Sequence, residues 1–437
     1  MALMYTVTVH GREEMLVVDG RYRVEEVLGA GTSGVVARAV EVASGKEVAV
    51  KKLSRLMDAK RLSTEALTLQ AKRTLRELAI QGVLDHPNIL ALLDVMPIAA
   101  SDATSFTDLY LVVELVDVDL RSVLASSQSL TSAHYVFFAY QILKALKYLH
   151  SAGCMHRDLK PDNCLTNAHC VLKICDFGLA KQHIVPDYEA VVVTRAYRAP
   201  ELFLDPYNYS EAIDMWAVGM MILEFLSGDA RPWLDGPTDL SQLNLILDTF
   251  GPPPSDLVDQ YPADARSYIL GYTFPPFVPL SARFPDAPPD LLDLATRLLD
   301  MDWRTRLSAA DALDHPVFDT EFRDRASEIE APHQLAPFDF ELAPSLDAST
   351  IRALLFNEML RFHPEAASHQ AYTADLYSML HPSPGPPSEP VPAAMATSPN
   401  YAFGSEPATS MAFPDDEPEF MSGGAAVGMD MGTPTLT

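Results

Sequence analysis

The chain lacks several features that would place it in particular classes of protein. No run of 18 apolar residues occurs in its 437 residues, and Met1 to Gly11 lacks the long apolar core of a signal peptide. These absences argue against a transmembrane helix and against secretion. Basic residues are also scarce, since 32 Lys and Arg face 59 Asp and Glu, a formal net charge of −27. Because nucleic acids and many membrane surfaces are anionic, we expect the protein to bind neither of them directly. We expect its partners to have basic segments.

Cysteine is equally scarce, and its distribution bears on the cellular compartment. The four cysteines lie in one stretch of the chain, at Cys154, Cys164, Cys170 and Cys175. They lack the spacing of zinc ligands and an accompanying pair of histidines, so we expect reduced thiols and neither a metal centre nor disulfides. Reduced thiols are typical of proteins that stay inside the cell. We therefore expect a soluble protein of the cytoplasm and nucleus.

The patterning of the central part predicts an α+β protein with two lobes. Hydrophobic residues make up 48% of the chain, enough for a sizeable core. Between residues 20 and 113, strand-like runs surround one helical stretch from Thr64 to Leu84, which predicts a small β-rich N-lobe. From Leu130 onward apolar residues recur at helical spacing, and Ser308 stands where a helix cap is expected. Residues 114–318 are therefore predicted to form a larger helical C-lobe.

The two ends of the chain lie outside these lobes. Residues 1–19 are assigned to an N-terminal extension and residues 319–365 to a C-terminal extension. From Phe362 to Thr437 the chain has nine Asp and Glu but no Lys or Arg, and prolines are frequent after His381. Such a segment cannot bury enough apolar surface to order itself. Residues 366–437 are therefore predicted to be an acidic, proline-rich, disordered tail.

Two short motifs carry the chemistry. The first is His156-Arg157-Asp158-Leu159-Lys160-Pro161-Asp162-Asn163, and the second, thirteen residues after Asn163 in a predicted β-hairpin, is Asp176-Phe177-Gly178. Both are typical of protein kinases. The kinase pattern assigns Asp158 as the base for the substrate hydroxyl and Lys160 as the group that steadies the γ-phosphate of ATP. Asn163 and Asp176 are predicted to hold Mg²⁺ ions, which neutralise phosphate charge during transfer.

A glycine-rich segment and a lysine come earlier in the chain, in the order that kinases require. The segment predicted to cover the ATP phosphates is Leu28-Gly29-Ala30-Gly31-Thr32-Ser33-Gly34-Val35-Val36. Its glycines let the backbone approach phosphate closely. The apolar run Val48-Ala49-Val50 then ends at Lys51, which is predicted to bind the α- and β-phosphates and to pair with Glu77 of a helix. Each feature is weak alone, but together they predict an ATP-dependent protein kinase.

The adenine-binding segment is expected at the end of the strand-like run Leu109-Tyr110-Leu111-Val112-Val113. Val113 is predicted to be the gatekeeper, the side chain that limits the back of the adenine pocket. The following hinge, Glu114-Leu115-Val116, offers backbone groups of Glu114 and Val116 to adenine. Cys175 is expected to face the same cavity.

Further stretches resemble one kinase family in particular, the mitogen-activated protein (MAP) kinases, over about residues 20 to 365. The resemblance rests on Lys173 to Lys181, on Thr194-Arg195-Ala196-Tyr197-Arg198-Ala199-Pro200-Glu201, on Asp214 to Gly219, on an insert from Gly251 to Ala287, and on Ala336 to Glu341 with Leu354 to Glu358. It implies a C-terminal extension that wraps back onto the small lobe, and Asp214 is expected to steady the catalytic loop. The general look of the chain is nearest the fungal cell-wall-integrity branch.

The chain departs from the family where the family is regulated. The Thr-X-Tyr pair expected five residues before Thr194 is replaced by Glu189-Ala190-Val191, so neither phosphorylatable residue is present. Ala196 stands in place of a tryptophan and Asp162 in place of Ser or Gly. The 26 positions between Lys51 and Glu77 also exceed the expected spacing by about eight residues, compared with the family pattern. We interpret the chain as a divergent member whose usual dual-phosphorylation switch is absent.

The resemblance also implies a substrate preference and a substitute for the activating phosphate. In the family a phosphothreonine at position 189 is bound by cations at the positions of Arg76, Arg157 and Lys181, so Glu189 is expected to act as a fixed substitute. Arg195 is expected to favour Ser/Thr-Pro substrates.

An acidic patch at Asp324, Glu328 and Glu330 lies where the family binds basic docking motifs. We also expect the protein to be a monomer.

The alternative hypothesis is an ATP-binding signalling scaffold or transcription co-regulator with little catalysis. Loss of the phosphorylation switch favours this alternative, and the intact Lys51, Asp158, Asn163 and Asp176 favour the enzyme.

Overall fold

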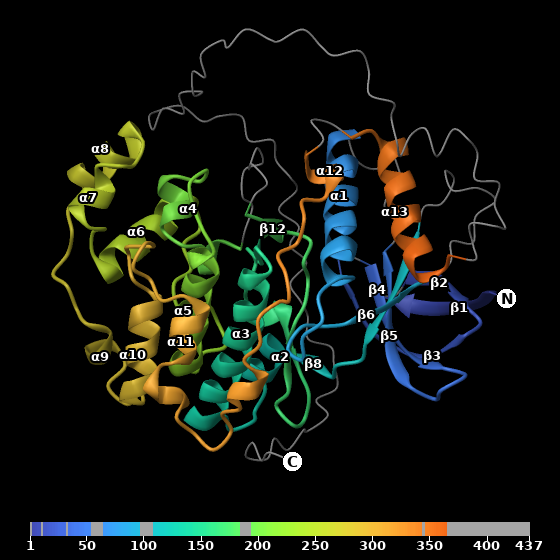
Figure 1. Ribbon diagram of the computed structural model, residues 1–437. Helices are drawn as coiled ribbons and strands as arrows, with labels where there is room; N and C mark the ends of the chain where they lie inside the picture. Colours follow the sequence, from blue (N-terminus) through green and yellow to red (C-terminus); the bar gives the residue numbers. More distant parts are fainter. Residues whose placement is uncertain are drawn as a thin grey trace, which may run out of the picture.

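The protein, seen in a computed structural model, has a β-rich lobe and a helical lobe side by side, and the chain passes between them after β7 (Figure 1). The two lobes match the predicted α+β, bilobal fold. The structure describes residues 2–9, 12–31, 34–53, 64–96, 108–183, 194–342 and 346–364. The predicted disordered tail, residues 366–437, lies outside the described residues.

The small lobe is built on a five-stranded antiparallel sheet with the order β3-β4-β5-β7-β6. Its strands are β3 (Tyr22–Gly31), β4 (Gly34–Glu41), β5 (Glu47–Leu53), β6 (Leu92–Val95) and β7 (Leu109–Glu114). Successive side chains of β4 alternate between buried and half-buried positions, as a strand with one covered face requires. The predicted helix is confirmed as α1 (Thr64–Gln81), whose Leu75 and Leu78 pack against Leu109 and Leu111 of the sheet.

The first residues, assigned only to an extension, form a β-hairpin of β1 (Ala2–Val9) and β2 (Arg12–Asp19). Leu16 and Val18 of β2 are buried in a cluster with side chains of the main sheet, including Val112. The backbone amide of Val17 also donates to the Tyr110 hydroxyl at 3.0 Å. The alternating Tyr5-Thr6-Val7-Thr8-Val9 is the sequence signal that indicates this strand.

The helical lobe surrounds a core centred on α3 and α5. Its helices are α2 (Leu120–Ala125), α3 (Ser132–Ser151), α4 (Glu201–Leu204), α5 (Ala212–Ser227), α6 (Asp239–Phe250), α7 (Ser255–Val258), α8 (Ala263–Gly271), α9 (Leu280–Arg283), α10 (Pro289–Leu298) and α11 (Ala309–Leu313), with 3-10 turns η1 (Pro161–Asn163), η2 (Arg195–Tyr197), η3 (Pro316–Phe318) and η4 (Arg325–Ser327). Phe138 of α3 and Trp216 of α5 are fully buried. A Cβ at Gly219 would meet Leu299 at 2.6 Å, so glycine is needed where α5 passes α10. The predicted cap is confirmed, because Ser308 accepts a hydrogen bond from the Asp311 amide.

Short strands in the helical lobe hold the loops that face the small lobe. They are β8 (Val118–Asp119), β9 (Cys154–Met155), β10 (Cys164–Thr166), β11 (Leu172–Ile174) and β12 (Lys181–Gln182). β10 pairs antiparallel with β11, which confirms the predicted hairpin between the two kinase motifs. The four cysteines are free thiols. Of the helices in the described residues, none is both long and apolar enough to span a membrane.

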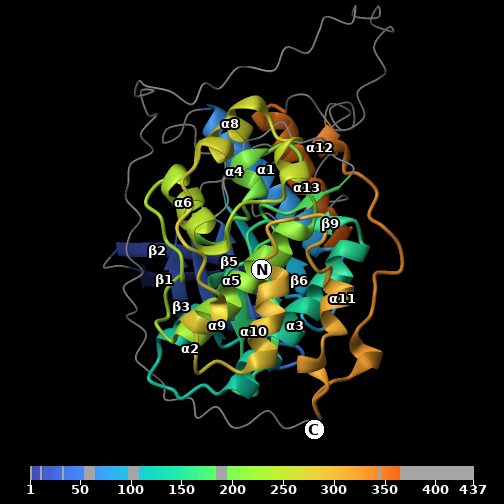
Figure 2. The same cartoon turned by 90° about the vertical axis from the view of Figure 1, so that its left-hand side faces the viewer.

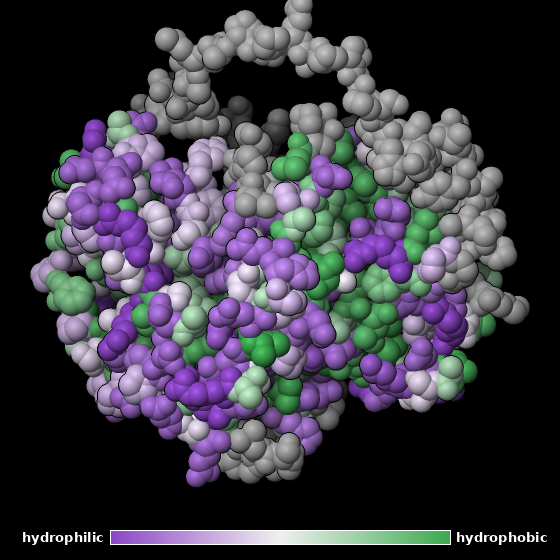
Figure 3. All heavy atoms as spheres, viewed as in Figure 1, coloured by the Kyte–Doolittle hydropathy of each residue, from purple (hydrophilic) through white to green (hydrophobic). Residues whose placement is uncertain are grey.

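The C-terminal extension returns to the small lobe, as predicted. In Figure 2 the orange connection runs along the outer edge of the molecule from the helical lobe to α12 (Asp339–Leu342). The last helix, α13 (Ala348–Phe362), lies beside α1 (Figure 1), and its Ile351, Leu355 and Phe356 are buried with Leu75 of α1. The face in Figure 3 shows hydrophobic residues gathered over this part of the small lobe, whereas the helical lobe is mostly hydrophilic there.

Candidate active site

Lys51 and Glu77, predicted to pair, are in contact. Lys51 lies on β5 and Glu77 on α1, and their Nζ and Oε1 atoms are 2.8 Å apart. Burial alone would lower the pKa of Lys51, but the neighbouring carboxylates of Glu77 and Asp176 raise it overall. Lys51 therefore stays charged and directed toward the cleft between the lobes.

Side chains predicted to line the adenine-binding slot form an apolar cluster beside this ion pair. Val113, the predicted gatekeeper, is 8% exposed and clusters with Ala49 of β5 and Leu90. Partly buried side chains complete the slot: Val36, Leu92, Leu115, Val116, Leu165 and Cys175. Leu165 was missed in the sequence, although an apolar residue two positions after the predicted metal ligand Asn163 is a readable signal. An apolar lining of this kind suits a purine ring.

The predicted phosphate loop belongs to the sheet of the small lobe. It joins β3 to β4, with Gly31 opposite Gly34, and Leu28 and Gly29 are exposed at the end of β3. At Gly34 the backbone φ is 128° and a Cβ would lie 1.8 Å from the carbonyl oxygen of Lys52, so only glycine fits. Thr32 and Ser33, also predicted to contact phosphate, lie outside the described residues.

The catalytic loop is held by a buried carboxylate beneath it. Asp214 of α5 accepts hydrogen bonds from the backbone amides of His156 and Arg157, each at 2.8 Å. Burial would raise the pKa of Asp214, but the contact with His150 and these amides lower it below its usual range. Arg157 adopts a left-handed φ of 68°, an unfavourable conformation for arginine that these bonds stabilise. Asp214 thus lies where it was expected to steady the loop.

Asp158, the predicted base, is the centre of a polar cluster. Its carboxylate lies 3.0 Å from Nζ of Lys160 and accepts a hydrogen bond from Nδ2 of Asn163 at 3.0 Å. The Thr194 hydroxyl donates a hydrogen bond to the Asp158 carboxylate at 2.8 Å. The same hydroxyl accepts a hydrogen bond from Nζ of Lys160 at 2.8 Å. The role of Thr194 was missed in the sequence, because 36 residues separate it from Asp158 and only folding brings them together. The predicted base, lysine and metal ligand are therefore in direct contact.

Asp176, the other predicted metal ligand, is joined to the same loop through its neighbour. The backbone amide of Cys175 donates to the carbonyl oxygen of Asn163 at 3.0 Å, which holds the residue before Asp176 against the other predicted ligand. Asp176 has a left-handed φ of 65°. Phe177 is fully buried and packs edge-on against His156, with ring centroids 5.2 Å apart. Burial of Phe177 keeps Asp176 on the cleft side of the segment.

The three cations expected to bind Glu189 lie near Gly178 to Lys181, where the activation segment begins. Arg157 donates to the carbonyl oxygen of Leu179 at 2.7 Å and to the Tyr209 hydroxyl at 2.7 Å. Lys181 lies over the ring of Tyr209 at 5.6 Å. Arg76 has an anionic partner from outside this segment, because it forms a two-pronged ion pair with Glu341 of α12. Glu189 itself lies outside the described residues.

The segment after Thr194 is tied to α6. Asp239 accepts from Arg195 at 2.9 Å and from Arg198 at 3.0 Å, although no such partner was predicted for Arg195. Burial would raise the pKa of Asp239, but its bonds with these arginines lower it. One carboxylate thus fixes both arginines of this segment.

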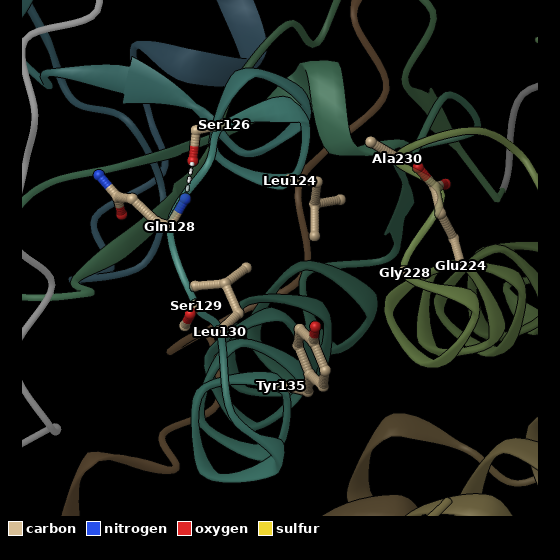
Figure 4. A pocket seen from close by; sticks show the side chains of 9 residues that line it. All are labelled: Leu124, Ser126, Gln128, Ser129, Leu130, Tyr135, Glu224, Gly228 and Ala230. Carbon is tan, nitrogen blue, oxygen red and sulfur yellow. Dashed lines mark hydrogen bonds between the residues drawn. The ribbon is translucent and has the colours of Figure 1, made fainter. Parts of the chain in front are cut away.

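Tyr197 connects the same segment to a pocket near α2. Its hydroxyl donates to Glu224 at 2.5 Å and accepts from Arg121, which also contacts Asp162 at 3.4 Å. Glu224 lines a pocket of about 290 Å³, where it lies across the opening from Leu130 and Tyr135 (Figure 4). None of the predicted ATP-binding residues lines this pocket. It is therefore separate from the nucleotide slot.

The predicted docking patch needs one correction. Glu328 is not available to a partner: its side chain is 8% exposed, paired with Arg323 at 2.9 Å, and accepts from the Tyr140 hydroxyl at 3.0 Å. The sequence could not reveal this, because Tyr140 is 188 residues away. Asp324 and Glu330 are exposed, as a docking surface requires.

Comparisons with known proteins agree with this geometry. Residues 22–318 match the family model described as the protein kinase domain. The chain is 40% identical over 354 residues to mitogen-activated protein kinase mpkA of Aspergillus fumigatus, covering 79% of this chain and 80% of the relative. It is 41% identical over 341 residues to the tobacco mitogen-activated protein kinase homolog NTF6, covering 77% and 87%. Fungal and plant relatives match about equally, so these comparisons do not separate the branches of the family.

Proposed function

The chain belongs to the mitogen-activated protein kinase family and is a serine/threonine protein kinase, and from that premise we propose that it phosphorylates Ser-Pro and Thr-Pro sites in proteins. The contact of Asp158 with Lys160, Asn163 and Thr194 is the observation that carries the activity. Asp158 would accept the proton of the substrate hydroxyl, and Lys160 would stabilise charge on the transferred phosphoryl group.

We propose that the cleft takes ATP with Mg²⁺, the cofactors typical of the family. Adenine fits the apolar slot between Ala49, Val113 and Leu165, with the hinge backbone of Glu114 and Val116 beside it. Lys51, aligned by Glu77, would bind the α- and β-phosphates. Among the described residues no group of three or more His, Cys, Asp or Glu could hold a metal. Mg²⁺ bound by Asn163, Asp176 and the nucleotide phosphates fits this donor set, because Mg²⁺ usually combines few protein ligands with phosphate and water.

Preference for a following proline would come from the fixed segment around Arg195. Arg195 donates to Asp239 and to the carbonyl oxygens of Gly236 and Pro237, so its side chain is tied to the start of α6. A substrate residue next to Thr194 would then meet a rigid wall, which favours proline because proline has no amide hydrogen to satisfy. The test compares peptides that differ only in Ser-Pro and Ser-Ala.

We expect kcat/KM at least tenfold higher for the Ser-Pro peptide, and a clear narrowing of that ratio in Asp239→Asn. Equal kcat/KM for the two peptides in the natural protein would refute the proline preference and leave the kinase activity itself untouched.

Glu189 is proposed to act as a fixed substitute for the activating phosphate. Because Arg76 is bound to Glu341, we propose that Glu189 adds a contact to those that Arg157 and Lys181 already make. A carboxylate brings one negative charge where phosphate brings nearly two, so we expect modest activity that needs no upstream kinase. Glu189→Ala and Glu189→Gln should both lower basal turnover severalfold, and unchanged turnover in both would disprove this role.

Asp324 and Glu330 are proposed to bind basic docking segments of partner proteins, without Glu328. Titration of a fluorescent Lys/Arg-rich peptide should show affinity that falls with salt and falls further in Glu330→Lys. Equal affinity in the variant would identify the patch as plain surface. We also propose that the protein acts as a monomer in the cytoplasm and nucleus, which sedimentation and imaging of a tagged chain can check.

A further inference from the structure

Glu341 of the C-terminal extension contacts α1, the helix that carries Glu77. We propose that Glu341 is a positioning residue for phosphoryl transfer: it binds Arg76 and thereby holds α1 where Glu77 can align Lys51. The proposal concerns the kinase activity and does not depend on Glu189.

The contact between the two side chains is close and buried. Nε of Arg76 lies 2.5 Å from one carboxylate oxygen of Glu341, and Nη2 lies 3.1 Å from the other. Only 6% of the Arg76 side chain and 10% of the Glu341 side chain are exposed. Lys72, one turn earlier on α1, adds its Nζ at 3.5 Å. Two-pronged pairs of arginine with carboxylate are the strongest and most directional of the common ion pairs.

Apolar packing on both sides of the carboxylate holds it in place. Phe340, the residue before Glu341, is 7% exposed and is buried with Leu75 and Leu78 of α1. Phe338 stacks on Phe340 with ring centroids 5.4 Å apart. The amide of Phe338 also donates to Gln182 of β12 at 3.1 Å. Glu341 is therefore delivered to Arg76 by an anchored part of the extension.

Arg76 connects Glu341 to the residues around the predicted reacting groups. Its Nη1 donates to the carbonyl oxygen of Gly178 at 3.0 Å, so α1 is linked to the segment that follows Asp176. Its neighbour in the chain, Glu77, holds Lys51 at 2.8 Å. One guanidinium group thus joins the C-terminal extension, the helix that carries Glu77 and the predicted metal-binding segment. Rotation of α1 away from the cleft would have to break all of these bonds.

The Arg76–Glu341 contact matters more in this chain because the Thr-X-Tyr pair is absent. A buried guanidinium without an anionic partner is costly, and this chain has no phosphothreonine to supply one. Glu341 satisfies Arg76 permanently, from a different part of the chain and without a modification. The small lobe can therefore hold its active arrangement before any regulatory event in the activation segment.

A double-mutant cycle tests the proposal on the full-length protein. Glu341→Gln, Arg76→Gln and the double variant are compared with the natural protein for kcat and for KM of ATP. The control is Asp339→Asn, because Asp339 lies exposed in the same helix. We expect about a tenfold fall in kcat/KM for ATP in Glu341→Gln, the size typical of one lost charge-assisted hydrogen bond. In the Arg76→Gln background, adding Glu341→Gln should cause less than a twofold further change, because coupled residues are not additive.

Thermal melting and hydrogen exchange separate positioning from plain stability. Faster exchange in the α1 peptide of Glu341→Gln, with α5 unchanged and partial recovery in Glu341→Asp, supports the proposal. Effects of Glu341→Gln and Arg76→Gln that multiply in the double variant would overturn it. So would turnover of Glu341→Gln that equals the control, or that falls only in proportion to the folded fraction. These results leave the Ser-Pro preference unaffected, since it does not involve Glu341.

Discussion

Replacement of Asp158 by asparagine removes the proposed base while keeping nearly the same shape. One oxygen of the asparagine side chain can still accept the Thr194 hydroxyl, now at 2.8 Å. Its new amide group would lie near Nδ2 of Asn163 and Nζ of Lys160, both now 3.0 Å from the carboxylate. Three donors would then face one another, so Lys160 should lose its preferred position as well.

The expected loss follows from these two effects. A positioned general base typically contributes ~10² to 10⁴ in rate, which corresponds to about 2.7 to 5.4 kcal/mol of activation free energy. Because Lys160 is also displaced, kcat should fall by about 10³ or more. ATP affinity should change little, since Lys51, the hinge and the apolar slot are unaltered. The fold should lose about 1.5 to 3 kcal/mol of stability, the usual cost of a lost charged hydrogen bond.

Two assays on the same preparation decide the outcome. Peptide phosphorylation gives kcat, and calorimetric titration with Mg-ATP gives the dissociation constant. A fall of kcat with an unchanged dissociation constant supports Asp158 as the base. A kcat of Asp158→Asn equal to that of the natural protein would refute the mechanism. A loss of activity fully explained by a smaller folded fraction would make Asp158 a structural residue of the loop.

Three further predictions concern other parts of the site. Val113→Phe should fill the back of the slot and raise the inhibition constant of enlarged ATP-competitive ligands at least tenfold; an unchanged constant would exclude Val113 as gatekeeper. Burial, and then the charge of Asp176, raise the pKa of the Cys175 thiol, so a thiol-reactive ATP-site ligand should label it slowly at neutral pH. Labelling that ATP does not block, or that persists in Cys175→Ala, would place the reactive thiol elsewhere. Burial and the nearby Lys144 lower the pKa of His86 from 6.5 to about 4, so the unfolded chain takes up this proton first as the pH falls. The free energy of unfolding should therefore decline from pH 6.5 down to about 4, less so in His86→Gln, and an identical decline in the variant would remove His86 as a cause.

The sequence predicted the parts of the site that are carried by local motifs. Asp158, Lys160 and Asn163 lie within six residues, and Asp176 follows in a hairpin, so spacing and residue type were sufficient to indicate their neighbourhood. Glu77 was found because its helix and the strand of Lys51 follow the kinase order. The two lobes followed from the change between strand-like and helical patterns.

Other contacts depend on tertiary packing and could not be predicted. Glu341 lies 265 residues from Arg76, and nothing in either local sequence indicates that they pair. The same holds for Asp239 with the two arginines that it binds. Glu328 looked like an exposed acid, because its burial depends on Tyr140 in a helix far away in the sequence. In each case the partners come from elements that are far apart in the sequence and meet only in the folded chain.

We propose that this divergent MAP kinase is catalytically active without phosphorylation of its activation segment. Protein made in bacteria that contain no MAP kinase pathway should be incubated with Mg-ATP and a Ser-Pro peptide, after mass spectrometry has shown residues 184–193 to be unmodified. We predict steady phosphorylation of the peptide, abolished in Asp158→Asn and reduced in Glu341→Gln. A rate for the natural protein no higher than that of Asp158→Asn, with ATP still bound, would show that the unphosphorylated chain is inactive and identify an ATP-binding scaffold.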